Sequence, residues 1–276
     1  MSEATRFFKG WAKPGPEAPG GVEAAEGETL DAISGYFRLF QYRDGHRYST
    51  DDVLTAWYGT SWCPSARKVL DLGSGIGSVG MIAAWRLPLA EFVTIEAQDM
   101  SVKLARKSAR YNGIEGRYEI RQGDFREPSV LATSEKFDLI LGSPPYFPLG
   151  SGVLSDHPQK VACRFEVRGT VVDYCARAAQ HLDWGGVFAG VFPVNQRERV
   201  AEGVRAAGAV MVRTRDVVFK EGDAPLLFLF LMMRQDHLPE SMRSTTWEEP
   251  PLVIRDGKGQ IHAEYRAVKL SVGFPP

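Results

Sequence analysis

A short motif in the middle of the chain has the groups needed to hold a planar amino group. Ser143-Pro144-Pro145-Tyr146 follows residues 137–141, a very apolar run typical of a buried strand. The two prolines fix the backbone and lack N–H groups, which leaves carbonyl oxygens as acceptors. Acceptors on both hydrogens of an exocyclic amine or amide NH2 direct the nitrogen lone pair, and the Tyr146 ring offers a face for a planar base. The motif predicts group transfer to such a nitrogen, chiefly by positioning. A Pro-Pro turn with a packed tyrosine is the structural alternative.

A glycine-rich turn follows an earlier apolar segment, residues 68–72. Asp71 precedes Gly73, Gly75 and Gly77, and glycines at alternate positions let a backbone turn tightly close to a ligand. A dinucleotide fingerprint would need a glycine where Ser78 stands, and the Asp71 carboxylate would repel a pyrophosphate. S-adenosylmethionine (SAM) has no phosphate, and its methionine end carries a cationic amino group that an aspartate network can bind. The turn therefore favours SAM as the cofactor.

Two more carboxylates stand at the ends of the next predicted strands. Glu96 ends residues 91–96, where a carboxylate accepts hydrogen bonds from both hydroxyls of an adenosyl ribose. Asp124 follows residues 117–122 and can accept a hydrogen bond from an adenine amino group, while Phe125 can flank the ring. A turn aspartate beside a core phenylalanine is the alternative for this pair.

The elements that must position these residues alternate along the chain. Strands are predicted at residues 36–42, 68–72, 91–96, 117–122, 137–141, 187–192, 210–219 and 226–233. Helices are predicted after residues 49–52 and at 79–87, 101–111, 170–182 and 196–207. This order predicts a doubly wound, Rossmann-like α/β fold with a seven-stranded, mostly parallel sheet and an antiparallel edge hairpin. Ligands bind such sheets outside the carboxyl ends of the strands, where all of these motifs fall. We expect residues 250–270 to add a small strand pair.

Composition limits the remaining classes. The 276 residues are 44% apolar and 24% charged with a net charge of −1, so the chain lacks the strong basic balance of many nucleic-acid binders. The longest apolar run, residues 226–233, is too short to span a bilayer, and no secretory apolar region opens the chain. We expect a cytoplasmic location without a membrane. The cysteines and histidines lack ligand spacing, so no metal is expected.

In this order, the motifs resemble the class I SAM-dependent methyltransferase fold over roughly residues 66–235. The Ser-Pro-Pro-Tyr tetrad resembles the N/D/S-P-P-Y/F/W signature of amino-group methyltransferases that act on adenine, cytosine or protein glutamine. The usual first residue is Asn or Asp, and the Ser143 hydroxyl is shorter. Residues 39–41, 45–54 and 252–265 look like the matching segments of the bacterial tRNA1(Val) adenine-37 N6-methyltransferase family, which extends the resemblance to about residues 30–268.

The second resemblance implies an enzyme that forms N6-methyladenosine in tRNA, next to the anticodon. On that basis Thr50 and Asp51 would cap a helix over the methionine end of SAM; plain helix N-caps are the alternative. Within residues 147–168, Lys160, Arg164 and Arg168 are candidates for contacts with RNA phosphates. A solvated charge mixture that includes Asp156 and Glu166 is the alternative for these three.

Three other interpretations stay open at this point. One is methylation of a protein glutamine or of another nucleic-acid or small-molecule amine. The second is a SAM-binding but catalytically silent RNA-binding or assembly factor, which Ser143 favours. The third is a nicotinamide-dependent dehydrogenase, against which the missing third glycine counts. The expected organisation is a disordered tail at 1–28, an N-terminal cap segment at 29–65, a SAM-dependent methyltransferase domain at 66–235 and a C-terminal extension at 236–276.

Overall fold

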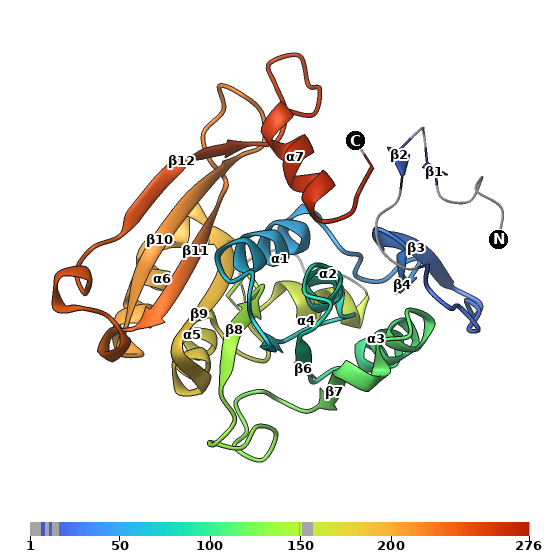
Figure 1. The fold of residues 1–276 in the computed structure, drawn as a ribbon, viewed down its shortest axis with the longest axis horizontal. Helices are drawn as coiled ribbons and strands as arrows, with labels where there is room; N and C mark the ends of the chain where they lie inside the picture. Colours follow the sequence, from blue (N-terminus) through green and yellow to red (C-terminus); the bar gives the residue numbers. More distant parts are fainter. Residues whose placement is uncertain (1–6, 9–10, 13–16, 149, 151–156, 276) are drawn as a thin grey trace.

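The central element is one twisted sheet with helices on both faces (Figure 1). The computed structural model describes residues 7–8, 11–12, 17–148, 150 and 157–275. Within them the sheet has eight strands in the order β12-β10-β11-β9-β8-β5-β6-β7. Their bounds are β5 Lys68–Leu72, β6 Glu91–Glu96, β7 Tyr118–Gln122, β8 Phe137–Gly142, β9 Leu182–Pro193, β10 Ala209–Val218, β11 Leu227–Arg234 and β12 Trp247–Val253. The run from β7 to β9 is parallel, and β11 is antiparallel to both β9 and β10. The predicted α/β class with a mostly parallel sheet is confirmed.

Both faces of the inner strands are buried, which explains their nearly continuous apolar sequences. On one face Val69 and Leu139 pack in the core cluster that includes α1 (Thr50–Trp62), α2 (Ser78–Arg86) and α3 (Asp99–Tyr111). On the other face Leu70 and Ile140 pack in a second cluster with α5 (Val171–His181) and α6 (Arg197–Ala206). The alternation of neighbouring strand residues between the two clusters follows from the period of two in a strand. This packing on both faces fixes the positions of the ends of the inner strands.

The C-terminal segment corrects two expectations. β12 pairs in parallel with β10, so the sheet has eight strands among the described residues, not seven, and the β10–β11 hairpin lies inside it rather than at its edge. The small strand pair expected at 250–270 is reduced to an isolated antiparallel bridge between Arg255 and Ile261, and α7 (Ala263–Ser271) follows it. Pro250 and Pro251 obscured β12 in the sequence, but an edge strand tolerates prolines because one side needs no partner.

The N-terminal part adds two hairpins, β1 (Phe7–Phe8) with β2 (Trp11–Ala12), and β3 (Glu28–Ser34) with β4 (Phe37–Tyr42). The β3–β4 hairpin meets the other end of the chain, because the Gly35 N–H donates a hydrogen bond to the Gly273 carbonyl at 2.8 Å. A Cβ on Gly273 would lie 2.5 Å from the Gly35 nitrogen, so this approach requires glycine. The proposed tail at 1–28 and the other domain boundaries stay predictions. Part of that tail lies outside the described residues, and within it the Gly20 N–H donates to the Tyr111 carbonyl at 3.0 Å.

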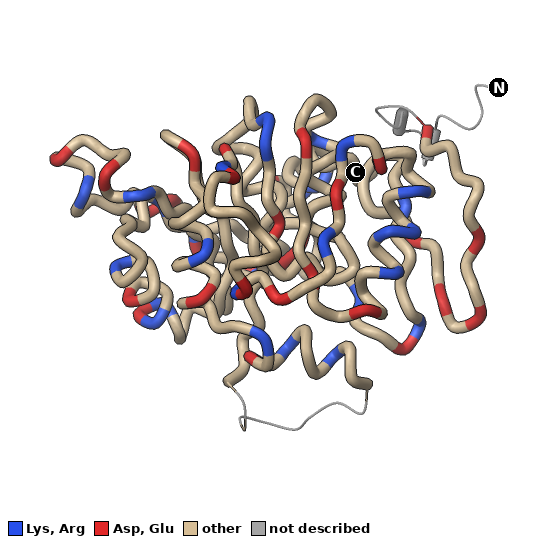
Figure 2. Tube along the Cα trace, turned by 90° about the horizontal axis from the view of Figure 1, so that it is seen from below, with Lys and Arg blue, Asp and Glu red and all other residues tan. Residues whose placement is uncertain are grey.

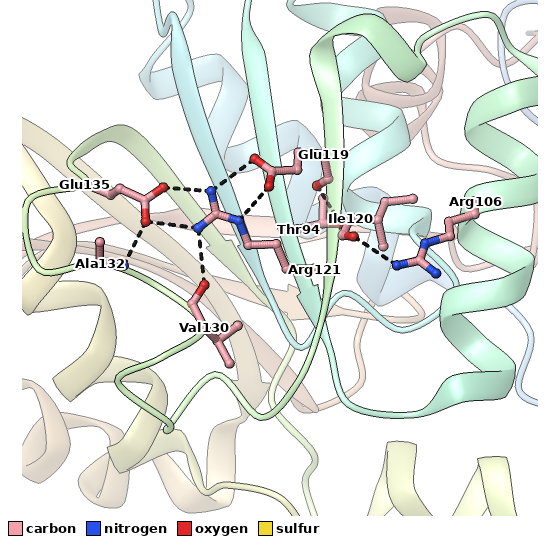
Figure 3. Close-up of polar contacts among 8 residues, drawn as sticks. All are labelled: Thr94, Arg106, Glu119, Ile120, Arg121, Val130, Ala132 and Glu135. Carbon is pink, nitrogen blue, oxygen red and sulfur yellow. Dashed lines mark hydrogen bonds and ion pairs between the residues drawn. The ribbon is translucent and has the colours of Figure 1, made fainter.

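At β7, an edge strand of the sheet, the forked guanidinium group of Arg121 makes several hydrogen bonds (Figure 3). The Arg121 guanidinium donates to Glu119 on β7 and, at 2.8 and 2.9 Å, to both carboxylate oxygens of Glu135. It also donates to the Val130 carbonyl at 3.2 Å. Because Glu135 and Val130 lie between β7 and β8, the fork ties this connection to the strand. The connection carries Asp124, a predicted site residue, and is thereby fixed at both ends.

Candidate active site

A cavity of about 700 Å³ opens at the carboxyl ends of β5, β6 and β8. Most of the predicted site residues line it: Asp51, Asp71, Gly73, Gly75, Glu96, Asp124, Phe125, Ser143, Pro144, Pro145 and Tyr146. Gly77 and Thr50 do not. The fold therefore brings the glycine turn, the strand-end carboxylates and the Ser-Pro-Pro-Tyr tetrad to one space, although they are spread from Asp71 to Tyr146 in the sequence.

The glycine turn needs its glycines for different reasons. Gly73 and Gly75 have φ values of 61° and 56°, in the left-handed region. A Cβ on Gly73 would collide with the Tyr174 hydroxyl, whereas one on Gly75 would meet nothing within 4 Å. Gly77 serves the helix instead: it is the N-cap of α2, and its carbonyl accepts the hydrogen bond from the Met81 N–H at 2.9 Å. Gly75 thus leaves open space on the wall of the cavity.

Three buried carboxylates form the floor of the cavity. Asp71 accepts a hydrogen bond from the Gly80 N–H at 2.9 Å, and Asp52 accepts one from the Ser49 N–H at 2.9 Å. Glu96 accepts from the N–H groups of Gly75 and Gln98 at 2.8 and 2.6 Å, which leaves lone pairs on both oxygens. Among the described residues none of the three carboxylates forms an ion pair.

Burial sets the protonation of this floor. It raises the pKa of Asp52 to about 7, and it raises the pKa of Asp71 well above its usual range, with the nearby Asp52 and Glu96 adding to the effect. Burial also raises the pKa of Glu96. Desolvated carboxyl groups without a counter-charge favour a positively charged ligand, because such a ligand lets them ionise.

The pair predicted to contact adenine, Asp124 and Phe125, is divided between the cavity and the core. Asp124 forms a bidentate ion pair with Arg126, whose side chain donates at 2.9 and 2.5 Å, and this hydrogen bonding holds the pKa of Asp124 below its usual range. Phe125 lines the cavity but is almost fully buried, with its ring edge-on to Tyr174 at a centroid distance of 4.5 Å. Asp124 is therefore ionised and oriented by a neighbouring arginine that the sequence prediction did not include.

The tetrad is held by contacts that its sequence does not reveal. The Tyr146 hydroxyl donates a hydrogen bond to Asp51 Oδ2 at 2.7 Å, and the Ser143 side chain acts to lower the pKa of the same phenol. Burial, with the Asp51 charge, raises the pKa of Tyr146 well above its usual range. The Gln196 side-chain amide donates to the Tyr146 carbonyl at 2.9 Å, and Phe192 meets the ring edge-on at 5.5 Å. Tyr146 is thereby held at its hydroxyl, at its backbone carbonyl and by the contact of its ring with Phe192.

The start of α1 corrects the predicted cap. Ser49 is the N-cap, with extended backbone, and its capping-box partner is Asp52; neither Thr50 nor Asp51 caps the helix. Asp51 instead accepts the hydrogen bond from the Tyr146 hydroxyl. Thr50 lies on the wall of a separate hollow of about 590 Å³ beside Tyr265. The capping box was readable as S-x-x-D, but four adjacent candidate caps concealed which residue takes the role.

The segment after the tetrad contains a helix where the sequence suggested a loop. α4 (Pro158–Arg164) has proline in its first turn, a helix-start signal that the prediction did not use. The candidates Lys160, Arg164 and Arg168 all line the cavity. Of the acidic neighbours weighed against them, Asp156 lies outside the described residues. Other lining residues that the sequence reasoning missed include Arg43, His46, Arg47, Asp52, Gln98, Cys163 and Tyr174.

Within the described ranges, no helix is long and apolar enough to cross a membrane. In the same residues no three His, Cys, Asp or Glu side chains gather in a way that could hold a metal ion.

Comparison with known proteins identifies the class of enzyme. Residues 60–159 match the methyltransferase small domain. The tRNA1(Val) (adenine(37)-N6)-methyltransferase of Tolumonas auensis is 27% identical over 237 residues, 84% of this chain and 92% of that protein. The protein of the same name from Pasteurella multocida is 26% identical over 83% of this chain and 90% of its own length. The release factor glutamine methyltransferase of Aliivibrio fischeri is 39% identical, but over only 83 residues, so this chain spans just 28% of that relative.

A solved structure has the same fold as this chain. A crystal structure of a predicted O-methyltransferase from Agrobacterium tumefaciens matches with a TM-score of 0.61 at 15% identity, covering 82% of this chain and 98% of that one. That likeness supports the Rossmann-like fold. The chain is therefore a methyltransferase with a Rossmann-like α/β fold, and its similarity to the tRNA1(Val) (adenine(37)-N6)-methyltransferases extends over most of its length.

Proposed function

We propose that this chain is a SAM-dependent N-methyltransferase that forms N6-methyladenosine in tRNA. One observation carries the proposal: a single cavity joins the glycine turn and its buried carboxylates to the Ser-Pro-Pro-Tyr tetrad. The relatives that match most of the chain are named for the same reaction. A tRNA substrate implies that the enzyme works in the cytoplasm.

The residues present fit SAM. Asp52, Asp71 and Glu96 are buried without a cationic partner in the described structure, and SAM is positively charged at its sulfonium and amino groups. Gly75 leaves space for a ligand that passes close to the backbone, and Glu96 retains lone pairs for ribose hydroxyls. Bound SAM would supply an electrophilic methyl group. The donors and the available space thus agree with the assignment made from sequence.

The tetrad supports an exocyclic amine as the acceptor of the methyl group. Pro144 and Pro145 line the cavity and have no N–H groups, so their backbones can only accept hydrogen bonds there. The adenine of a tRNA loop would be flipped out of its stack and laid on the Tyr146 ring. Its nitrogen would be oriented by acceptors on both hydrogens. The proton leaves after transfer, so no strong base is required.

A glutamine side chain is the second candidate substrate. Its amide NH2 presents the same two hydrogens as the adenine amine, and the local identity to a release factor glutamine methyltransferase is the observation that favours it. That identity covers 30% of this chain, in contrast to the 83–84% covered by the tRNA-modifying relatives. The longer match makes tRNA the leading candidate.

Mass spectrometry of nucleosides tests the proposal directly. Unmodified tRNA is incubated with purified protein and SAM, and in parallel with the variants Tyr146→Ala and Asp71→Ala. We expect N6-methyladenosine only with the parent protein. Calorimetry should show that Tyr146→Ala retains SAM binding while Asp71→Ala loses it. Absence of any methylated nucleoside, together with methylation of a release factor, would transfer the assignment to glutamine. SAM binding without transfer to either substrate would indicate a silent binding factor.

The serine of the tetrad has a separate test. Ser143 lines the cavity, and the Asn or Asp usual at this position has a longer side chain. We expect Ser143→Asn to be as active as the parent or more active in the same nucleoside assay. Complete loss of activity would mean that the serine has a role that an amide cannot fill.

A further inference from the structure

Charge is segregated between the floor and the mouth of the cavity. The buried carboxylates form the floor, as described above. Four cationic side chains, Arg43, Lys160, Arg164 and Arg168, also line the cavity and reach it from the turn after β4 and from α4 and the segment behind it. All are exposed except Lys160, which is half-buried. We call these four residues the basic rim.

Among the described residues, the basic rim has no ion-pair partners. The thirteen ion pairs found in that part of the chain include none with Arg43, Lys160, Arg164 or Arg168. Arg168 senses Glu96 and Asp124 only through longer-range attraction. These cations are therefore available to a ligand.

Glu166 and Asp44, the described acids nearest to the rim residues in sequence, form no ion pair with the rim. Glu166 lies between Arg164 and Arg168 in the sequence, but Arg199 of α6 binds its two oxygens at 2.6 and 2.8 Å. Asp44 is exposed next to Arg43 and does not line the cavity. In Figure 2, blue basic residues lie along the segment that the lower grey trace joins, and both charge colours are spread over the rest of the tube. The net charge of −1 hides this local excess.

A half-buried histidine, His46, lies in the positive field of the basic rim. His46 lines the same mouth, and its backbone N–H donates to Gln159 Oε1 of α4 at 2.9 Å. Burial, with the charges of Arg164 and Lys160, lowers the pKa of His46 to about 4. The imidazole is neutral at physiological pH, so it does not add to the charge. The positive field at the mouth comes from the arginines and the lysine.

We propose that the basic rim binds the phosphates on either side of the nucleotide whose base enters the cavity. The inference rests on the proposed function and deepens it, because it assigns the backbone contacts of the RNA to Arg43, Lys160, Arg164 and Arg168. Cations around the mouth of an acidic pocket suit a ligand with a neutral base and a polyanionic backbone. A glutamine side chain on a protein has no such repeated charge. The rim therefore distinguishes the two candidate substrates by their chemistry.

Salt dependence of RNA binding tests the rim without any need for catalysis. The probe is a fluorescently labelled, unmodified tRNA transcript, and its affinity is measured by anisotropy. The KCl concentration is varied from about 0.05 to about 0.5 M, because salt screens exposed charges over about 10 Å at ~0.1 M. The variant Lys160→Gln/Arg164→Gln removes two rim charges. Its control, Lys220→Gln/Arg266→Gln, removes two exposed charges that line neither of the two hollows described.

Counterion release gives the expected size of the effect. Each lost phosphate contact reduces the slope of log K against log salt by about 0.7 in a single-stranded segment, which is about fivefold in affinity at ~0.1 M salt. The rim variant should therefore bind tRNA about 25-fold more weakly, with a slope smaller by about 1.4, since two contacts are lost. The control should bind as the parent does. SAM affinity, measured by calorimetry, should be unchanged in both variants.

The outcomes separate this inference from the function on which it rests. Methylation of tRNA by the parent, with an unchanged salt slope in the rim variant, would overturn the rim and leave the function standing. Weaker, salt-shifted binding in the rim variant would support the rim even if the nucleoside assay detected no methylation. Equal losses in the rim variant and in its control would also overturn the assignment, because they would indicate only overall charge.

Discussion

The hydrogen bond between Tyr146 and Asp51 should carry a measurable part of catalysis. Tyr146→Phe keeps the ring but removes the donor to Asp51, which accepts at 2.7 Å. A hydrogen bond to a charged group contributes about 1.5–3 kcal/mol, so kcat should fall roughly 12- to 150-fold if the bond holds the ring in its working position. SAM affinity should remain close to that of the parent. Steady-state methylation of tRNA, with both tRNA and SAM at saturating concentrations, gives kcat.

A double-mutant cycle shows whether the two side chains act through one bond. Asp51→Asn should reduce kcat by a similar factor, and the double variant should be little worse than either single one, because the interaction is already lost. Additive losses would refute the reasoning. Tyr58→Phe is the matched control: its hydroxyl donates to Glu249 at 2.6 Å, between α1 and β12, and does not line the cavity. It should lower stability without changing kcat.

Two further predictions concern stability and the glycine turn. Asp52 has a pKa of about 7 in the fold against 3.8 as its ordinary value, so its contribution to stability is full below pH ~4 and is lost as the pH rises to about 7, about 4 kcal/mol in all. Asp52→Asn cannot ionise and should be more stable than the parent at pH 8 but not at pH 4; a pH-independent difference in urea unfolding would contradict this. Gly73→Ala should destabilise the fold through the Tyr174 hydroxyl, whereas Gly75→Ala, with open space around it, should mainly weaken SAM binding. Equal effects of the two substitutions on thermal unfolding would contradict the different roles assigned to them.

Much of the fold was predictable because the inner strands carry strong local signals. β5 and β6 agree with their predicted bounds, since each is a buried apolar run that ends at a carboxylate or a glycine turn. β3 escaped detection because Glu28, Thr29 and Asp31 interrupt its apolar pattern. β12 escaped for a similar reason, since its prolines are tolerated only through its position at the edge of the sheet.

The candidate site, like the fold, was only partly predictable from the sequence. Motifs close to a strand end, such as Asp71 or the tetrad, were identifiable because strand order places them at one edge of the sheet. The partners of those motifs were not, because they come from distant segments. Gln196 reaches Tyr146 across 50 positions, and Asp51 reaches it across 95. No local pattern encodes such pairs, and only the packing of α1 and the β9 end against β8 brings them together.

The contact between Gly35 and Gly273 joins segments that are far apart in the sequence, and it has a consequence for how the protein is made. The ribosome releases the β3–β4 hairpin long before it releases Gly273, whose carbonyl receives the Gly35 N–H. β12 likewise joins β10 only after β11 has been made. These contacts therefore cannot form while the intervening chain is still being synthesised. A chain that stalls before β12 would leave the β3–β4 hairpin and the outer edge of β10 open to other partners.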